Sequence, residues 1–208
     1  MAVAAALFSF SSVAPAQATD IALEPSGPRI ETTAMWVDGR GPHEDNHDEV
    51  LLLRKESDTP MVGAVVAVRG MSGVSPSDVR QLSWDRREDG ACSVSAPTWG
   101  LAIEGQSGVS YVTYLPCTDA EHSSTGDARW THDEFSADMV RAAIRRVGGS
   151  DSELGELRAV AILFSDGPTD GPGYAYIDNV TVNETTWRSS DRLEVARVGA
   201  ALTQPDSR

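Results

Sequence analysis

The sequence contains a single lysine, Lys55, and only two cysteines, Cys92 and Cys117. Lysine and arginine together number 17 against 31 acidic residues, which gives a formal net charge of -14. A chain this acidic repels phosphate groups instead of displacing their counterions. The composition therefore argues against nucleic acid and anionic lipid as ligands, whereas neutral glycans, cations and basic protein partners remain open.

Long apolar runs are also missing, so no stretch of the sequence is expected to insert into a membrane. The nearest approach is the short apolar run Ala2–Phe10, which is followed by the small-residue cleavage pattern Ala16-Gln17-Ala18. We therefore expect residues 1–18 to be a signal peptide and the protein to be secreted, although no basic residue precedes the run. A disordered terminus rich in alanine and serine is the alternative. Residues 19–187 would form the folded domain and 188–208 a polar C-terminal tail.

The two cysteines are not in a Cys-x-x-Cys motif, which argues against redox catalysis. In an exported chain, a pair of cysteines is more often a disulfide than a metal or redox site. A bridge between Cys92 and Cys117 would close a loop of about 25 residues and stabilise the fold by roughly 3 kcal/mol. The sequence therefore predicts a Cys92–Cys117 disulfide.

Catalytic signatures are absent as well. The sequence has no Gly-x-Ser-x-Gly elbow, no His-Glu-x-x-His pair and no phosphate-binding glycine loop. A glycoside hydrolase needs only two carboxylates, roughly 5–10 Å apart across a cleft. An acidic surface accounts for the number of carboxylates without any catalytic role. A non-catalytic protein is therefore favoured, with a glycoside hydrolase as an alternative.

What the sequence does contain is a series of short apolar segments separated by Gly, Pro, Asp and Ser, which is typical of β-strands. One segment differs, because Phe135, Met139, Ala143 and Val147 lie four residues apart, as on one face of a helix. These patterns predict an all-β jelly-roll β-sandwich with one short helix at 136–147. The expected strands are Glu49–Lys55, Met61–Gly70, Val79–Asp85, Thr98–Glu104, Val109–Cys117, Leu157–Asp166 and Gly173–Asn183.

The acidic segment from His43 to Glu49 could donate oxygen or nitrogen to a metal ion at every position. Its spacing does not match an EF-hand loop, and its two histidines would share a face only in a helix. Gly41-Pro42 precedes it and a strand-like run follows, so we interpret it as a solvated loop. A calcium site and a zinc site remain alternatives.

Two stretches resemble a known class of domains. The segment AILFSDGPTDGPGYAYIDNVTVN, residues 161–183, is similar to the last hairpin of galactose-binding-like jelly-roll domains, a class that includes many carbohydrate-binding modules. The segment LSWDRREDGACSVSAPTWGLAIEG, residues 82–105, resembles part of secreted bacterial proteins with this fold. In related modules an Asp at the position of Asp178 often joins an early Glu to hold a structural calcium, and the resemblance implies Glu24 as that partner.

Exposed aromatic side chains are the candidates for sugar stacking, although packing in the core is favoured for each one taken alone. Trp84 follows Leu82 on one strand face, and Trp99 shares a face with Leu101 and Ile103, so we expect both in the core.

Trp130 follows a loop and is therefore a candidate for exposure. Tyr174 and Tyr176 alternate with core positions and share a strand face with Asp178, Val180 and Val182. With the resemblance and the export signal, these residues favour a secreted, non-catalytic module for glycan or cell-envelope polysaccharide. A protein-interaction or surface-structural module on the same scaffold is the alternative.

Overall fold

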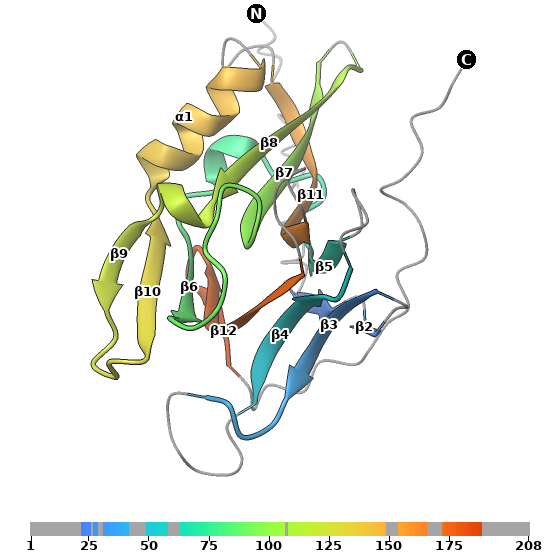
Figure 1. The fold of residues 1–208 in the computed structure, drawn as a ribbon. Helices are drawn as coiled ribbons and strands as arrows, with labels where there is room; N and C mark the ends of the chain where they lie inside the picture. The colour runs from blue at the N-terminus through green and yellow to red at the C-terminus, as the bar shows by residue number, and fades with distance from the viewer. Residues whose placement is uncertain are drawn as a thin grey trace, which may run out of the picture.

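The computed structural model describes residues 22–25, 27–28, 31–41, 49–57, 63–106, 108–148, 154–165 and 172–188. These residues form two antiparallel β-sheets packed face to face, with one α-helix (Figure 1). The expected signal peptide, residues 43–48 of the acidic segment, the turn at 166–171 and the tail from residue 189 lie outside the described residues.

The smaller sheet has five strands in the spatial order β1-β5-β11-β7-β8. Their bounds are β1 Ala22–Pro25, β5 Gly63–Arg69, β11 Leu154–Ser165, β7 Thr98–Gly105 and β8 Ser110–Pro116.

The larger sheet has eight strands, in the order β2-β3-β4-β12-β6-β10-β9, with β13 paired to β12. Their bounds are β2 Gly27–Pro28, β3 Thr32–Val37, β4 Val50–Lys55, β12 Gly173–Val182, β6 Leu82–Arg87, β10 Trp130–Phe135, β9 Glu121–Ser124 and β13 Thr185–Trp187. The chain crosses between the sheets from β1 to β2, β4 to β5, β5 to β6, β6 to β7, β8 to β9, β10 to β11 and β11 to β12. This connectivity is that of a jelly roll, so the predicted fold class is confirmed.

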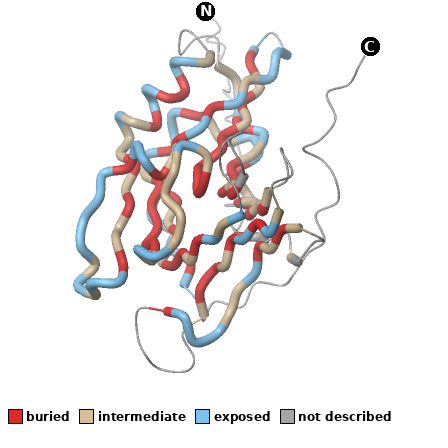
Figure 2. The backbone as a smooth tube through the Cα atoms, in the orientation of Figure 1, coloured by how far each residue is buried: buried red, intermediate tan, exposed pale blue. Residues whose placement is uncertain are grey.

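Aromatic rings from both sheets fill the centre of the sandwich. Trp84 of β6 stacks on Trp99 of β7 with ring centroids 5.2 Å apart, and Phe135 of β10 meets Trp84 edge-on at 5.4 Å. All three side chains are fully buried. Along the strands, buried residues alternate with residues that are not (Figure 2). The expected core positions of Trp84 and Trp99 are therefore confirmed.

The predicted helix is present as α1, Ala137–Gly148, within one residue of the expected range. It buries Val140, Ala143 and Ile144. Thr113 of β8 donates a hydrogen bond to the carbonyl of Ala143 at 2.9 Å, and α1 lies beside β8, the last strand of the smaller sheet (Figure 1). Thr113 is opposite the buried Leu101 of β7, so the helix packs on the core-facing side of β8. None of the helices in the described part of the chain has the length and apolar character needed to span a membrane.

The disulfide prediction is also confirmed. Cys92 lies in the loop between β6 and β7, and Cys117 opens the 3-10 helix η2, Cys117–Asp119, directly after β8. Their Cα atoms are 5.3 Å apart and the sulfur atoms are bonded. The bridge joins the loop that leaves the larger sheet to the last strand of the smaller one, so it ties the two layers together.

Several strands were not predicted. β1, β2, β3, β9, β10 and β13 have no counterpart among the expected segments. β6 begins at Leu82 because Val79 still belongs to the turn after the 3-10 helix η1, Pro76–Asp78. All four residues of β9 are exposed, and β10 carries charged side chains on both faces. A strand without an apolar face leaves no periodic signal in the sequence.

A buried carboxylate joins three strands of the larger sheet. Asp133 of β10 is fully buried and accepts hydrogen bonds on Oδ2 from Trp84 Nε1 and from Arg86 Nε, each at 2.9 Å. Its Oδ1 lies 2.7 Å from Nδ1 of His122 on β9. The sulfur of Cys117 is 3.4 Å from Oδ2, and because it belongs to a disulfide it carries no proton and makes a contact only. The Arg86–Asp133 ion pair is thus buried and hydrogen-bonded.

Replacing Asp133 with alanine should leave Arg86 inside the protein without its counter-charge. We expect the free energy of unfolding, measured by urea denaturation, to fall by about 3–5 kcal/mol. Glu56→Ala is the control, because Glu56 pairs with Arg54 at the surface, where both side chains are about half exposed. Such a pair contributes at most about 1 kcal/mol. Similar losses in the two variants would contradict the role assigned to Asp133.

Candidate functional site

Side chains from five strands cover the outer face of the larger sheet. The ring of Trp84 enters the core, so the next residues along β6 alternate and Asp85 and Arg87 point outward. Residues directly opposite each other in antiparallel strands point to the same face. Met35 of β3 is opposite Leu52 of β4, which is opposite Tyr176 of β12. Tyr176 contacts Arg87 of β6, which is opposite Trp130 of β10. These five residues form one row across the strands.

Two tyrosines and an arginine form the centre of this face. The rings of Tyr174 and Tyr176 meet edge-on, with centroids 5.5 Å apart. The guanidinium carbon of Arg87 lies 3.9 Å from the centroid of the Tyr176 ring, within the range of a cation–π contact. Tyr174 is exposed and Tyr176 is half-buried. The planes of two rings and one guanidinium are thus held together on a face of the sheet.

Asp89 fixes this arrangement from the loop after β6. Its carboxylate accepts from Arg87 Nε at 2.6 Å and from Arg87 Nη2 at 3.0 Å, and the Tyr174 hydroxyl donates to it at 3.3 Å. The hydrogen bond from Arg87 holds the pKa of Asp89 below its usual value, against an opposing effect of burial. Burial alone would lower the pKa of Arg87, but the hydrogen bond and charge of Asp89 outweigh it and raise that pKa. The pair therefore stays charged over the neutral range. We call Arg87, Asp89, Tyr174 and Tyr176 the tyrosine–arginine cluster.

Trp130 does not fulfil the expectation from the sequence. It occupies the end of the same row, directly opposite Arg87, but only 2% of its surface is exposed. The expected exposure of Trp130 is therefore wrong. A position after a loop suggests exposure, but Trp130 is the first residue of β10 and its side chain is buried.

A second cross-strand row lies beside the cluster. Asp85 of β6 is opposite His132 of β10 on one side and Asp178 of β12 on the other. Asp85 Oδ1 is 2.6 Å from His132 Nδ1, and Asn179 Nδ2 donates to Asp85 Oδ2, also at 2.6 Å. Both oxygens of the Asp85 carboxylate are thus engaged.

A β-bulge places Asn179 for that bond. The register of β12 against β6 shifts between Asp178 and Thr181, and Asn179 has a φ of 46°. Asparagine tolerates the left-handed region better than most residues do. The bulge also reverses the alternation, so Val180 is fully buried in the core while Tyr174 and Tyr176 stay on the outer face. The expectation that the two tyrosines share a face with Val180 and Val182 is therefore wrong.

The residues expected to bind calcium do not share a sheet. Glu24 belongs to β1, at the edge of the smaller sheet, where its backbone pairs with Ala67. Asp178 is buried in β12, near the middle of the larger sheet. Among the described residues, no three His, Cys, Asp or Glu side chains are grouped so that they could hold a metal ion. The Glu24–Asp178 calcium site stays a prediction from the resemblance.

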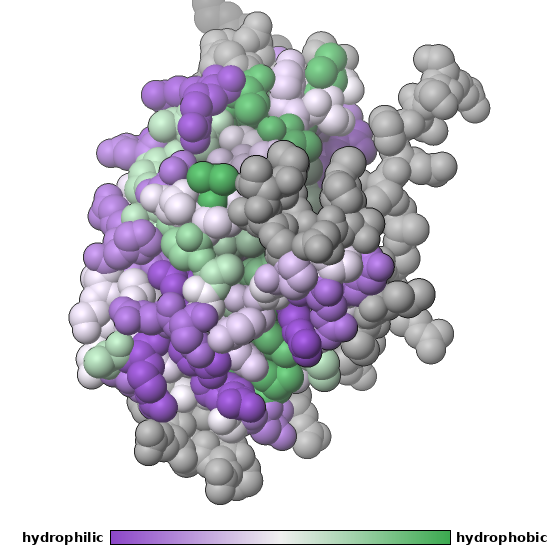
Figure 3. All heavy atoms as spheres, in the orientation of Figure 1, coloured by the Kyte–Doolittle hydropathy of each residue, from purple (hydrophilic) through white to green (hydrophobic). Residues whose placement is uncertain are grey.

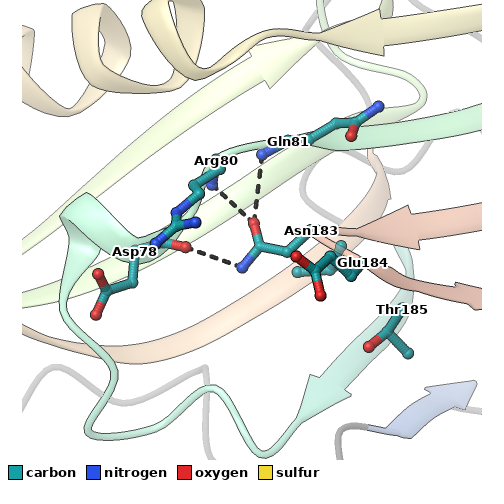
Figure 4. Close-up of a pocket in the computed structure, with 7 residues that line it drawn as sticks. Asp78, Arg80, Gln81, Asn183, Glu184 and Thr185 are labelled. Carbon is teal, nitrogen blue, oxygen red and sulfur yellow. Dashed lines mark hydrogen bonds between the residues drawn. The ribbon is translucent and has the colours of Figure 1, made fainter.

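A polar hollow of about 440 Å³ lies at the other end of β12. Its centre is Asn183, whose side chain closes the gap between the β12–β13 turn and the segment before β6 (Figure 4). Asn183 Oδ1 accepts from the backbone nitrogens of Arg80 and Gln81 at 2.7 and 3.3 Å, and its Nδ2 donates to the carbonyl of Asp78 at 2.9 Å. Both polar atoms of the Asn183 side chain are hydrogen-bonded to the backbone of the segment before β6. We therefore assign a structural role to the residues that line the hollow.

The outer face of the smaller sheet is more apolar than that of the larger one. Val109, Val112 and Tyr114, on the β7–β8 hairpin, are about half exposed. Hydrophobic residues reach the surface at that end of the molecule, whereas the surface around β9 and β10 is mostly hydrophilic (Figure 3). The two faces of the sandwich therefore offer different chemistry to a partner.

No family model matches the sequence, and no curated protein is significantly similar to it. Similar solved structures include the family 30 carbohydrate-binding module of the cellulosomal cellulase Cel9D-Cel44B of Clostridium thermocellum. It is 11% identical, with a TM-score of 0.38 over 79% of this chain and 99% of that chain. A non-crystalline cellulose-specific module, CBM28, is 16% identical, with a TM-score of 0.38 over 77% of this chain and 86% of that chain.

A third similar structure is TmCBM27, a carbohydrate-binding module with specific mannan recognition. It is 16% identical, with a TM-score of 0.29 over 77% of this chain and 86% of that chain. At these TM-scores the fold assignment rests on the sheet order and pairing of this chain alone.

Asn183 has a φ of 55°, in the left-handed region. Two substitutions should therefore separate the contribution of its hydrogen bonds to stability from the cost of its backbone conformation. Asn183→Ala removes the hydrogen bonds and keeps an unfavourable φ, so we expect a loss of about 1–3 kcal/mol in the free energy of unfolding. Asn183→Gly removes the same bonds but tolerates that φ, and should be more stable than the alanine variant by about 1 kcal/mol. Equal urea midpoints for the two variants would show that the conformation of residue 183 carries no cost.

Proposed function

We propose that this protein is a secreted, non-catalytic module that binds glycan on the outer face of its larger sheet. The observation that carries the proposal is the tyrosine–arginine cluster, in which Tyr174 and Tyr176 are held beside the charge pair of Arg87 and Asp89. Sugars present apolar C–H faces that pack on aromatic planes and hydroxyls that bond to charged groups. The cluster offers both kinds of contact within one site.

The shape of the face favours an extended ligand. Adjacent strands lie about 4.8 Å apart, so the part of the row that excludes the buried Trp130, from Met35 to Arg87 across four strands, spans roughly 14 Å. Met35 is 38% exposed at one end of this part, and Tyr176 and Arg87 lie at its other end. A polysaccharide chain laid across the strands would touch several of these side chains, whereas a single sugar would touch few.

Charge favours a neutral ligand. The chain carries a formal net charge of -14, which repels anionic polymers. The positive charge of Arg87 is balanced by Asp89 at 2.6 Å. Neutral polysaccharides, including those of cell envelopes, are therefore the ligand class that we propose.

The state of the carboxylates supports binding over hydrolysis. Asp85 and Asp178 lie opposite each other, as the two carboxylates of a hydrolase would, but one oxygen of Asp85 is bonded to His132 and the other to Asn179. Asp178 is 4% exposed. A glycosidase needs one carboxyl free to protonate the leaving oxygen and a second free to attack or to activate water.

A protein partner is a second candidate function, because of the smaller sheet. Val112 and Tyr114 are 47% and 52% exposed on neighbouring outward positions of β8. Exposed apolar side chains grouped on one face are typical of protein interaction sites. This candidate uses the opposite face of the sandwich, so the two functions can be separated by substitution.

The direct test is binding of the mature chain to a panel of neutral polysaccharides that includes non-crystalline cellulose and mannan. We expect saturable binding to one class of glycan. Tyr174→Ala and Tyr176→Ala should each weaken that binding about tenfold or more in depletion isotherms, because each removes a central contact surface.

Tyr114→Ala is the matched control, since it removes an exposed tyrosine from the other sheet. It should leave glycan binding unchanged. Loss of binding in Tyr114→Ala, with full binding in Tyr174→Ala and Tyr176→Ala, would move the site to the smaller sheet. An absence of binding to the whole panel would reject the glycan proposal and favour a protein partner.

A further inference from the structure

We infer that β8 pairs with β8 of a second copy of this chain, so that the protein forms an edge-to-edge dimer. β8, Ser110–Pro116, is the last strand of the smaller sheet, and among the described strands it pairs with β7 alone (Figure 1). The inference concerns the sheet opposite the tyrosine–arginine cluster, so the dimer does not depend on glycan binding.

β8 differs from the other strands that end the two sheets. β1 has four residues, including Glu24 and Pro25, β2 has two residues, and β9 has four residues, including Glu121. Short length, charge and proline are the features that keep edge strands from pairing with other chains. β8 has seven residues, no charged side chain and an unbroken register with β7. It therefore lacks the protection that the other edges have.

The hydrogen bonds at the two ends of the β7–β8 pair show which backbone groups face β7. The nitrogen of Gly105 donates to the carbonyl of Val109 at 2.7 Å, and the nitrogen of Cys117 donates to the carbonyl of Pro97 at 3.0 Å. In an antiparallel ladder, every second residue directs both of its backbone groups to the same neighbour. The odd-numbered residues 109–117 therefore face β7.

The even-numbered residues of β8 direct their backbone groups to the open edge. Ser110, Val112 and Tyr114 each offer an N–H and a carbonyl there, and Pro116 offers a carbonyl. Val112 and Tyr114 are 47% and 52% exposed. A Cβ atom at Gly100 of β7 would lie 3.7 Å from Cε1 of Tyr114, so this ring leans toward β7 and not over the edge. The backbone groups at the edge are thus accessible to another strand.

Helix α1 contacts β8 from a different direction. The contact is the hydrogen bond from the Thr113 hydroxyl to the carbonyl of Ala143, on the core-facing side of the sheet. A further strand would lie in the plane of the sheet, about 4.8 Å beyond β8. The helix therefore does not take the place of a paired strand.

Charge favours a second copy as the occupant of this edge. The outward residues of β7 opposite Val112 and Tyr114 are an alanine and a glycine. Glu104, the one acidic residue of β7, is paired with Arg158 at 2.6 Å. A basic partner would find no unpaired carboxylate on these two strands. Two copies of a chain with a formal net charge of -14 repel each other less at this uncharged edge than elsewhere.

The sequence of β8 also suits pairing with itself. In an antiparallel pair with a two-fold axis at Thr113, Val112 of each copy is opposite Tyr114 of the other. Each of these pairs exchanges two hydrogen bonds, and aromatic residues opposite β-branched ones are favourable cross-strand pairs. Ser110 is opposite Pro116, so the residue without an N–H lies at the end of the ladder.

The dimer would place both tyrosine–arginine clusters on one side. Because the two copies of β8 are antiparallel in one plane, the two-fold axis is perpendicular to the smaller sheet. The larger sheet packs face to face on the smaller one, so the outer faces of the two larger sheets point the same way. If the proposed function holds, on which this consequence rests, one polysaccharide chain can engage both copies and bind more tightly than to one.

The first experiment is sedimentation velocity of the mature chain from about 1 to about 300 μM. An edge pair buries less area than a standard interface, so we expect a dimer with a dissociation constant of about 10–100 μM. Val112→Lys places a charge on the open edge and should weaken the dimer about tenfold or more. Val94→Lys is the matched control, because Val94 is 74% exposed in the loop between β6 and β7. It should dimerise like the wild type, and thermal melts verify that both variants fold.

Hydrogen exchange at single residues tests the mode of pairing. We expect the amides of Val112 and Tyr114 to exchange about fivefold more slowly at dimer concentrations than in the monomer. The amides of Tyr111 and Thr113, which face β7, should exchange at the same rate in both. A dimer formed through α1 or through the outer face of the sheet does not produce this alternation.

A chain that stays monomeric over the whole range, a dimer without alternating protection, or a Val112→Lys variant that dimerises like the wild type overturns the inference. Slow exchange of the Val112 and Tyr114 amides that is independent of concentration assigns the edge to another segment of the same chain and also overturns it. A dimer that binds no glycan overturns the proposed function alone, whereas glycan binding by a strictly monomeric chain overturns this inference alone.

Discussion

The buried carboxylate of Asp133 is the interaction on which the larger sheet depends. It neutralises Arg86, accepts from Trp84 and contacts His122, so it constrains β6, β9 and β10 at once. An unpaired charge inside a protein costs several kcal/mol. The strands therefore have one acceptable register, and that register also decides which residues meet on the outer face. His132 is opposite Asp85 for the same reason that Asp133 is opposite Trp84.

The disulfide adds a second constraint at the same place. Cys117 is fully buried, and its sulfur lies 3.4 Å from the Asp133 carboxylate. Cys92 lies in the loop that follows Asp89, a member of the tyrosine–arginine cluster. The bridge limits the freedom of this loop in the unfolded chain and fixes one end of it in the native state. The site is therefore supported from the core by a charge pair and from the loop by a covalent bond.

The sequence was sufficient to predict those parts of the fold that depend on apolar pattern. β7 and β8, α1, the disulfide and the stacked tryptophans all follow from alternation, helical spacing or cysteine number. β9 and β10 could not be predicted, because their polar and charged residues leave no periodic apolar signal. The reversal at Asn179 is invisible for another reason, since a bulge depends on how two strands pair and not on the residues of one.

For the candidate site, the sequence indicated Tyr174 and Tyr176 but neither Arg87 nor His132. Both tyrosines follow clean alternation within one strand, which is a local property. Arg87 reaches Tyr176 only because β6 lies beside β12, 89 residues further along the chain by residue number, and His132 is oriented by a residue of β6. A sequence read alone does not determine which strands are neighbours. The charged run Asp85–Asp89 contains the local hint, because Arg87 ends a strand and Asp89 follows it by two residues.

The alternation along β12 separates two kinds of heritable change. Tyr176 stands between Ala175 and Ile177, which are both fully buried. Substitutions at the outward positions can alter the chemistry of the surface without disturbing the core, and substitutions at the inward positions alter folding without changing that surface. A lineage of such proteins could therefore change its outer face by single steps on a scaffold that stays the same.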